Sequence, residues 1–159
     1  MSKKTDKHSE DTSLQDRVSV IEINGILFGI DIVKSKEIFP LTEVTPIPNT
    51  KEFVRGVFNL RGDIYPLIDI STILGLQPVK NNKDNMIILL EGNGVTMGIL
   101  ANRVHDVRPL QTSLVKPSKG VAAKGMEEFV SGMISEKGSD IFLLDIDRLF
   151  SSPVINRYY

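Results

Sequence analysis

The sequence predicts a mostly β fold of two tandem, five-stranded β-barrel subdomains with a few short helices. Two internal matches carry this prediction. The segment Phe53–Ile70 returns as a weaker copy at Phe129–Ile146, and the segment Glu22–Leu41 returns at Glu91–Leu110. Because both matches occur in the same order with their glycines in register, they indicate a structural unit that is present twice.

The duplication divides the chain into two similar units, at about residues 17–80 and 81–150. Residues 1–16 precede them and are polar and charged, without the apolar core of a signal peptide. We expect this stretch to be a disordered N-terminal tail. We expect residues 151–159 to form a C-terminal tail.

Each unit begins with a predicted β-hairpin. β-Branched and aromatic residues nearly alternate along residues 18–23 and 26–32, which is typical of strands. Asn24-Gly25 lies between them and supplies the positive φ angles of a tight hairpin turn. The second unit repeats this pattern with strands at residues 86–90 and 95–100 around Asn93-Gly94.

Short elements complete each unit. Asn49 is placed to cap a helix over residues 50–55, and residues 57–58 and 64–68 read as an antiparallel strand pair. Residues 145–150 predict a terminal helical turn. About five strands in so short a unit bury one face only if they curl into a small barrel, so we expect two barrels with a groove between them.

Composition excludes several classes of function. The formal net charge is −1, which gives no general attraction to nucleic acid or to an anionic membrane. The chain contains no cysteine, which excludes disulfides and thiolate chemistry and fits a cytosolic protein. No apolar run approaches the ~20 residues of a membrane span, so direct membrane insertion is not expected.

Residues that could suggest chemistry have simpler interpretations. The glycine-rich string at residues 91–98 lacks the helix that a dinucleotide loop requires, and the Asn-Gly hairpin signal explains its glycines. His105 has no cysteine or second histidine at metal-ligand spacing. Asp69 recurs as Asp145, each before a short helical turn, and both are better explained as N-caps than as general acids. The sequence therefore predicts no catalytic residue, no metal site and no cofactor.

The loop at residues 59–63 is the part of the repeat that differs most between the copies. Asn59-Leu60-Arg61 in the first copy stands where Ser135-Glu136-Lys137 stands in the second. Loops on a rigid scaffold concentrate binding residues, and Arg is over-represented in interface hot spots. One scaffold built twice, with one loop specialised, indicates a recognition surface and not a reaction centre.

Several strings, taken together, resemble the CheW-like domain family of bacterial chemotaxis coupling proteins. The resemblance covers about residues 17–150. Its strings are FGIDIVKSKEI (Phe28–Ile38), VTPIPNTKEFVRGVFNLRGDIYPLIDI (Val44–Ile70), MGILANRVHDV (Met97–Val107), FVSG (Phe129–Gly132) and DIFLLDIDRLF (Asp140–Phe150).

The resemblance implies two SH3-like five-stranded barrels and no catalysis. It implies an adaptor that links the cytoplasmic tip of methyl-accepting chemoreceptors to the regulatory domain of the histidine kinase CheA. The receptor tip is a helical hairpin, which is expected to dock in the groove at the first barrel and the junction. The protein would then be cytoplasmic and recruited to membrane-bound receptor arrays. Two alternatives stay open: an adaptor of a non-motility or twitching kinase pathway, and a small-ligand-binding β-barrel.

Carried over by position, the family's receptor- and kinase-contacting residues give the candidate partner-binding set. Ser35 departs from the apolar residue that is more usual there, and Asp63 and Tyr65 also differ from common members. The candidate residues are Ile32, Lys34, Ser35, Glu37, Ile38, Gly56, Asn59, Leu60 and Arg61.

Overall fold

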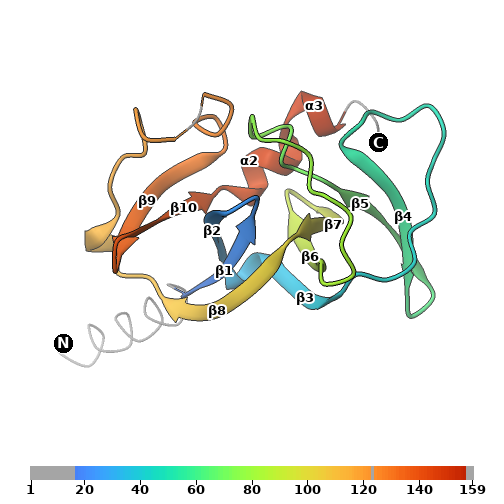
Figure 1. Cartoon of the computed structure of the whole chain (residues 1–159), viewed down its shortest axis with the longest axis horizontal. Coiled ribbons are helices and arrows are strands. Elements are labelled where there is room, and N and C mark those ends of the chain that lie inside the picture. The colour runs from blue at the N-terminus through green and yellow to red at the C-terminus, as the bar shows by residue number, and fades with distance from the viewer. Residues whose placement is uncertain (1–16, 123, 157–159) are drawn as a thin grey trace, which may run out of the picture.

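Two five-stranded sheets lie side by side in the computed structural model, which describes residues 17–122 and 124–156 (Figure 1). Sheet A has the order β8 (Arg103–Pro109), β1 (Arg17–Ile23), β2 (Ile26–Asp31), β10 (Ser139–Leu144) and β9 (Val130–Glu136). Sheet B has the order β3 (Ser35–Pro40), β6 (Met86–Gly92), β7 (Val95–Ala101), β5 (Asp63–Ile68) and β4 (Val54–Leu60). The prediction of a mostly β fold with two five-stranded units is confirmed.

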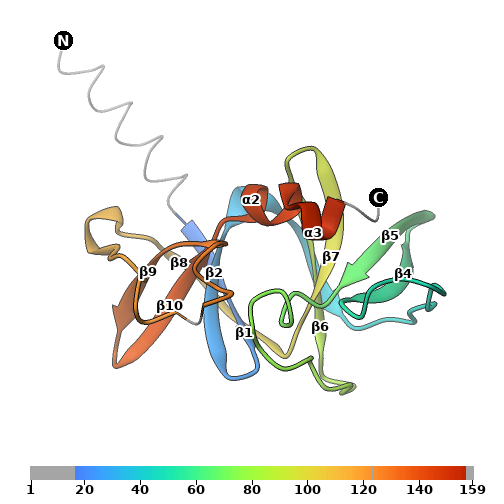
Figure 2. The ribbon, with the colours of Figure 1, turned by 90° about the horizontal axis from the view of Figure 1, so that it is seen from above.

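Short helical elements are few in the described part of the chain. The 3-10 turn η1 (Ile32–Lys34) joins β2 to β3, and a second one, η2 (Thr112–Leu114), follows β8. The helices α2 (Ile146–Ser151) and α3 (Pro153–Asn156) end it. They lie across one side of the junction between the sheets (Figure 2). No helix among the described residues is long and apolar enough to span a membrane.

Each sheet curls until its two edge strands approach. In sheet B, the chain just after β3 returns to β4, where Thr45 and Val57 exchange backbone hydrogen bonds of 2.8 and 2.9 Å. In sheet A, the chain after β8 does the same with β9 through Lys116 and Met133, at 2.8 and 2.9 Å. The duplicated sequence therefore builds the same edge-to-edge contact twice.

The sheets do not follow the two halves of the sequence. Sheet B is the continuous run β3 to β7, whereas sheet A combines β1 and β2 with β8, β9 and β10. The expectation that each half curls into its own barrel is therefore wrong: each half gives its first hairpin to the sheet that holds the last three strands of the other. The repeat boundaries at 17–80 and 81–150 describe the sequence repeat and not the sheets.

The sequence pattern does not predict this exchange of hairpins. Alternation of apolar and polar residues indicates a strand and its buried face, but it does not indicate the sheet to which the strand belongs. The connections that cross between the sheets are short. η1 carries the chain from sheet A to sheet B, and Asn102 alone returns it from β7 to β8. Matched by the repeat, the two sheets have the same strand order, including the parallel pairs β10–β2 and β5–β7.

Repeated glycines mark places where side chains from other strands of the same sheet come close. A Cβ on Gly29 would lie 3.0 Å from Leu143 Cδ2, and a Cβ on Gly98 would lie 2.7 Å from Phe58 Cε1. The two glycines occupy matching positions of β2 and β7. Their retention in both copies is explained by the same packing requirement inside each curled sheet.

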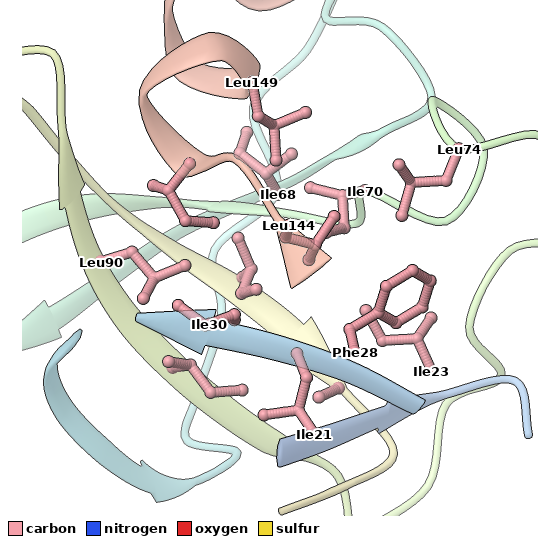
Figure 3. Close-up of a cluster of buried hydrophobic side chains, with 14 of the residues drawn as sticks. Ile21, Ile23, Phe28, Ile30, Ile68, Ile70, Leu74, Leu90, Leu144 and Leu149 are labelled. Carbon is pink, nitrogen blue, oxygen red and sulfur yellow. The ribbon is translucent and has the colours of Figure 1, made fainter. Parts of the chain in front are cut away.

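The core continues across the junction because β1 is buried on both faces. Val18 and Val20 belong to a cluster with Ile134, Ile141 and Leu143 inside sheet A. Ile21 and Ile23 belong instead to the larger cluster shared by both sheets and α2. The labelled side chains of this cluster gather between the ribbons of the two sheets in Figure 3: Ile21, Ile23, Phe28, Ile30, Ile68, Ile70, Leu74, Leu90, Leu144 and Leu149.

Local predictions had mixed outcomes. The helix expected over residues 50–55 is wrong: Asn49 adopts a left-handed φ of 62° and turns lead directly into β4 at Val54. The hairpin turns are confirmed, with φ of 51° at Asn24 and 50° at Asn93. The terminal helix is also confirmed as α2, where the Asp145 carboxylate accepts a hydrogen bond of 3.0 Å from the Arg148 backbone N–H.

The exchanged hairpins predict that neither half of the chain folds alone. Residues 1–82 contain β1 and β2 without their neighbours β8 and β10, and β3, β4 and β5 without β6 and β7. We expect this fragment and the fragment 83–159 each to lack β structure, and an equimolar mixture to recover it. Far-UV circular dichroism and amide NMR spectra measure this. A dispersed, native-like spectrum from either fragment alone would contradict the exchange.

Candidate functional site

The candidate partner-binding residues form two groups, one on each edge of sheet B. Ile32 and Lys34 lie in η1, and β3 follows with Ser35, Glu37 and Ile38. Gly56, Asn59 and Leu60 lie on β4, and Arg61 lies in the turn between β4 and β5. β3 and β4 are the two edges of sheet B, so the strand order alone would hold these groups apart.

The curl of sheet B brings Arg61 and Glu37 together across its edges. Arg61 Nη1 donates to Glu37 Oε2 at 2.8 Å, and Arg61 Nη2 donates to Glu37 Oε1 at 2.6 Å. This is the paired, planar geometry that makes Arg–carboxylate contacts specific. The Arg61 side chain is 72% exposed and that of Glu37 is 30% exposed, so the pair stands at the surface and stays accessible to a partner.

A tight turn presents Arg61. Arg61 has a φ of 51° and is followed by Gly62 in the connection from β4 to β5. The Asn59 side-chain oxygen accepts a hydrogen bond of 3.0 Å from the Gly62 N–H. Asn59 therefore restrains the turn that carries Arg61. Ile64, which is 60% exposed, pairs with Asn59 and adds apolar surface next to this turn.

The ion pair shifts both titrations. The hydrogen bond from Arg61 holds the pKa of Glu37 below its ordinary value of 4.5. The same hydrogen bond raises the pKa of Arg61. Both groups are therefore charged at neutral pH, and the contact persists over the physiological range.

Lys34 is held by a carboxylate of α2. Its Nζ lies 2.7 Å from Asp147 Oδ2. Asp31 caps the same 3-10 turn by accepting a hydrogen bond of 3.1 Å from the Val33 backbone N–H. Val33 itself is 62% exposed. The crossover from sheet A to sheet B thus presents an apolar side chain beside a lysine with a fixed partner.

The remaining candidates contribute shape more than exposed contact. Gly56 is buried and has a φ of 141°, and a Cβ there would lie 2.3 Å from the Thr45 carbonyl oxygen. Ile32, Ile38 and Leu60 are half-buried. Ser35 pairs with Leu90 of β6, which places the unusual serine in the sheet.

Other polar residues act within the fold. The Asp69 carboxylate, 2% exposed in its side chain, lies 2.8 Å from Arg55 Nη2. It also accepts hydrogen bonds of 3.0 Å and 2.9 Å from the Ser71 and Val79 backbone N–H groups. His105 pairs with Glu22 at 2.9 Å. The hydrogen bonds of Asp69 fix the loop after β5. This agrees with its interpretation as a residue that caps backbone N–H groups.

The sequence did not indicate the residues that hold the candidates in place. The candidate set does not include Asp147, and the sequence does not predict the pairing of Glu37 with Arg61. Asp147 occupies the first turn of α2, where an acidic residue is common for helix-dipole reasons, so its position alone carries no functional signal. Only the fold brings it beside Lys34.

Comparison with known proteins places the chain among chemotaxis proteins. The family model of the CheW-like domain matches residues 17–154. Chemotaxis protein CheW of Klebsiella aerogenes is 34% identical over 125 residues, which cover 79% of this chain and 75% of the relative. Chemotaxis protein CheW of Rhizobium meliloti is 29% identical over 125 residues, which cover 79% and 81%. The crystal structure of the scaffolding protein TtCheW from Thermoanaerobacter tengcongensis matches with a TM-score of 0.77 and 29% identity, covering 87% of this chain and 94% of that one.

Gly56→Ala should destabilise the fold because the new methyl group would overlap the Thr45 carbonyl. We expect a loss of about 3 kcal/mol in the free energy of unfolding, measured by urea denaturation. Gly62→Ala is the matched control: Gly62 also has a positive φ, of 90°, but nothing lies within 4 Å of a Cβ there. The control should lose only about 1 kcal/mol. Equal losses would show that the Thr45 contact is unimportant.

The Arg61–Glu37 contact predicts a pH window. The folded-state pKa of Glu37 is depressed. The contribution of the pair to the stability of the fold is therefore fully present above the ordinary pKa of 4.5, and it is lost as the pH falls through the depressed pKa. An NMR titration of the Glu37 carboxyl carbon should give a midpoint below 4.5 in the native chain. In Arg61→Ala the midpoint should rise, whereas Lys137→Ala, in the matching turn of sheet A, should leave it unchanged. An unchanged midpoint in Arg61→Ala would refute the assignment.

Proposed function

Because the chain belongs to the CheW-like domain family, we propose that it is a non-catalytic adaptor that couples transmembrane chemoreceptors to the histidine kinase CheA. The observation that carries the proposal furthest is Arg61: a solvent-exposed guanidinium in a tight turn, oriented by a bidentate pair with Glu37. Its position in the specialised loop of the repeat supports a role in contacting a partner.

The surface around Arg61 is suited to protein recognition. Two of its guanidinium nitrogens each give a hydrogen bond to Glu37, which leaves other N–H donors for an acceptor on a partner. Ile64 and the half-buried Leu60 provide apolar contact close by. Arginine is enriched among interface hot spots, so an oriented arginine with apolar side chains beside it is suited to be one.

The crossover at η1 offers a second surface. Val33 and Lys34 lie where the chain passes from sheet A to sheet B, beside the junction. We assign this place to the receptor, whose helical hairpin would lay an apolar face against it. The kinase regulatory domain would contact barrel ends, including the Arg61 turn. The adaptor is then cytoplasmic and recruited to receptor arrays through these contacts.

Simultaneous occupancy is the proposed mechanism. The junction core includes both sheets and α2, so the two surfaces are fixed relative to one another. A change in the bound receptor helices therefore alters where the kinase domain is held. Each contact can be modest, because an array supplies many linked contacts.

Replacement of Arg61 by alanine tests the proposal. We expect Arg61→Ala to weaken binding of a CheA regulatory-domain fragment or a receptor-tip fragment about thirtyfold, or about 2 kcal/mol, by isothermal titration calorimetry. Lys137→Ala is the matched control, because Lys137 has nearly the same backbone φ, 50° against 51°, in the corresponding turn. It should change neither affinity.

Unchanged affinity of the folded Arg61 variant for both fragments would refute the hot spot. Failure of the native chain to bind either fragment would refute the coupling function itself. A pull-down from the source cell with the native chain and the Arg61 variant would then identify the partner, and a swimming defect on deletion separates chemotaxis from another kinase pathway.

A further inference from the structure

One carboxylate, that of Asp147, joins three elements that are far apart in the sequence. Its Oδ2 lies 2.7 Å from Lys34 Nζ at the end of η1. Its Oδ1 accepts a hydrogen bond of 2.8 Å from the Asn93 backbone N–H in the turn between β6 and β7. Asp147 itself lies in the first turn of α2. α2 thus connects the crossover segment η1 to the β6–β7 hairpin.

The fold places this carboxylate firmly. Ile146 packs so closely on β6 that a Cβ on Gly92 would lie 2.8 Å from Ile146 Cγ2. Leu149 and Phe150 of α2 are completely buried, and Asp145 caps the helix. α2 therefore cannot turn or slide without disturbing the junction core, and Asp147 stays at one place.

The surroundings of Lys34 are acidic. A cleft of about 290 Å³ is lined by Lys34 together with three carboxylates, Asp31, Asp145 and Asp147, and by apolar residues that include Val18 and Leu143. Lys34 is the only cationic residue of this lining. Chiefly because of the hydrogen bond to Asp147, the pKa of Lys34 is raised, and the hydrogen bond from Lys34 in turn lowers the pKa of Asp147.

We infer that Asp147 is a positioning residue, which holds the Lys34 ammonium group so that it meets the receptor helices already ordered. The inference rests on the proposed function, because it assigns the η1 surface to the receptor. An unrestrained lysine loses rotamer freedom when it binds, and a lysine held beforehand does not.

The charge balance of the cleft also indicates which chemical group on the partner binds the Lys34 ammonium group. One positive charge among three negative ones leaves the cleft net negative, which disfavours a carboxylate on the partner. The matching group on the receptor helices is therefore a neutral oxygen, such as a side-chain amide or a free carbonyl at a helix end. Val33 would contact apolar side chains of the receptor helices next to that group.

Asp147→Asn tests the inference because it removes the charge that holds Lys34 and keeps an oxygen for the Asn93 N–H. We expect its affinity for a receptor-tip fragment to fall about threefold, as a partly exposed ion pair allows. Its affinity for the kinase regulatory-domain fragment should be unchanged. In the Lys34→Ala background, Asp147→Asn should have no further effect. Glu91→Gln, which removes the neighbouring ion pair with Lys36, is the control and should not alter receptor affinity.

The outcomes separate the inference from the function it rests on. Equal or tighter receptor binding by Asp147→Asn overturns the inference, because it means that Asp147 masks Lys34 or merely repels the partner. An undiminished effect in the Lys34→Ala background also overturns it, because the role of Asp147 is then purely structural. NMR relaxation of the Lys34 side chain in the unbound protein provides an independent measure: unchanged order in Asp147→Asn overturns the positioning role even when the native chain binds both partners. Absence of receptor binding by the native chain overturns the proposed function instead.

Discussion

The hairpin β1–β2 carries apolar side chains on both faces, and this double burial constrains the whole molecule. One face completes the interior of sheet A with Val18 and Val20, while Ile21 and Ile23 meet sheet B and α2. A strand buried on both sides cannot stand at a free surface, so the two sheets must pack together. The junction is therefore part of the hydrophobic core, and the surfaces on either side of it cannot move independently.

The same constraint explains how similar edges acquired different surfaces. In sheet B, Arg61 in the turn after β4 reaches Glu37 on β3; in sheet A, Arg108 on β8 lies 2.7 Å from Glu136 at the end of β9. Both pairs join the edge strands of a curled sheet, but the charges are reversed. The Arg108 side chain is 28% exposed against 72% for Arg61. The two sheets share one scaffold, but of these two arginines only Arg61 of sheet B is largely exposed to solvent.

Much of the fold could be predicted from the sequence because short local sequence patterns specify its turns and strands. Asn24-Gly25 and Asn93-Gly94 specify their hairpins, and the repeat predicts two five-stranded units. The exchange of hairpins could not be predicted, because the alternation of apolar and polar residues does not indicate the sheet to which a strand belongs. The helix expected after Asn49 failed because Asn also favours the left-handed conformation that it adopts here. The resemblance implies Lys34, Glu37 and Arg61 as candidate residues, but their pairings depend on contacts between distant segments.

These pairings change what the candidate charges can do. Lys34 and Arg61 each already have a carboxylate partner, so a protein that binds here gains little from a further ion pair and must not break the existing ones. In the proposed function, affinity then comes from apolar contact at Val33 and Ile64 and from hydrogen bonds of the remaining Lys34 and Arg61 N–H donors to neutral acceptors, while the fixed charges set the orientation of the partner and exclude wrong ones. For an adaptor that must hold two proteins at a defined spacing, orientation is the property on which function depends. A rigid junction with pre-oriented charges at each surface supplies it.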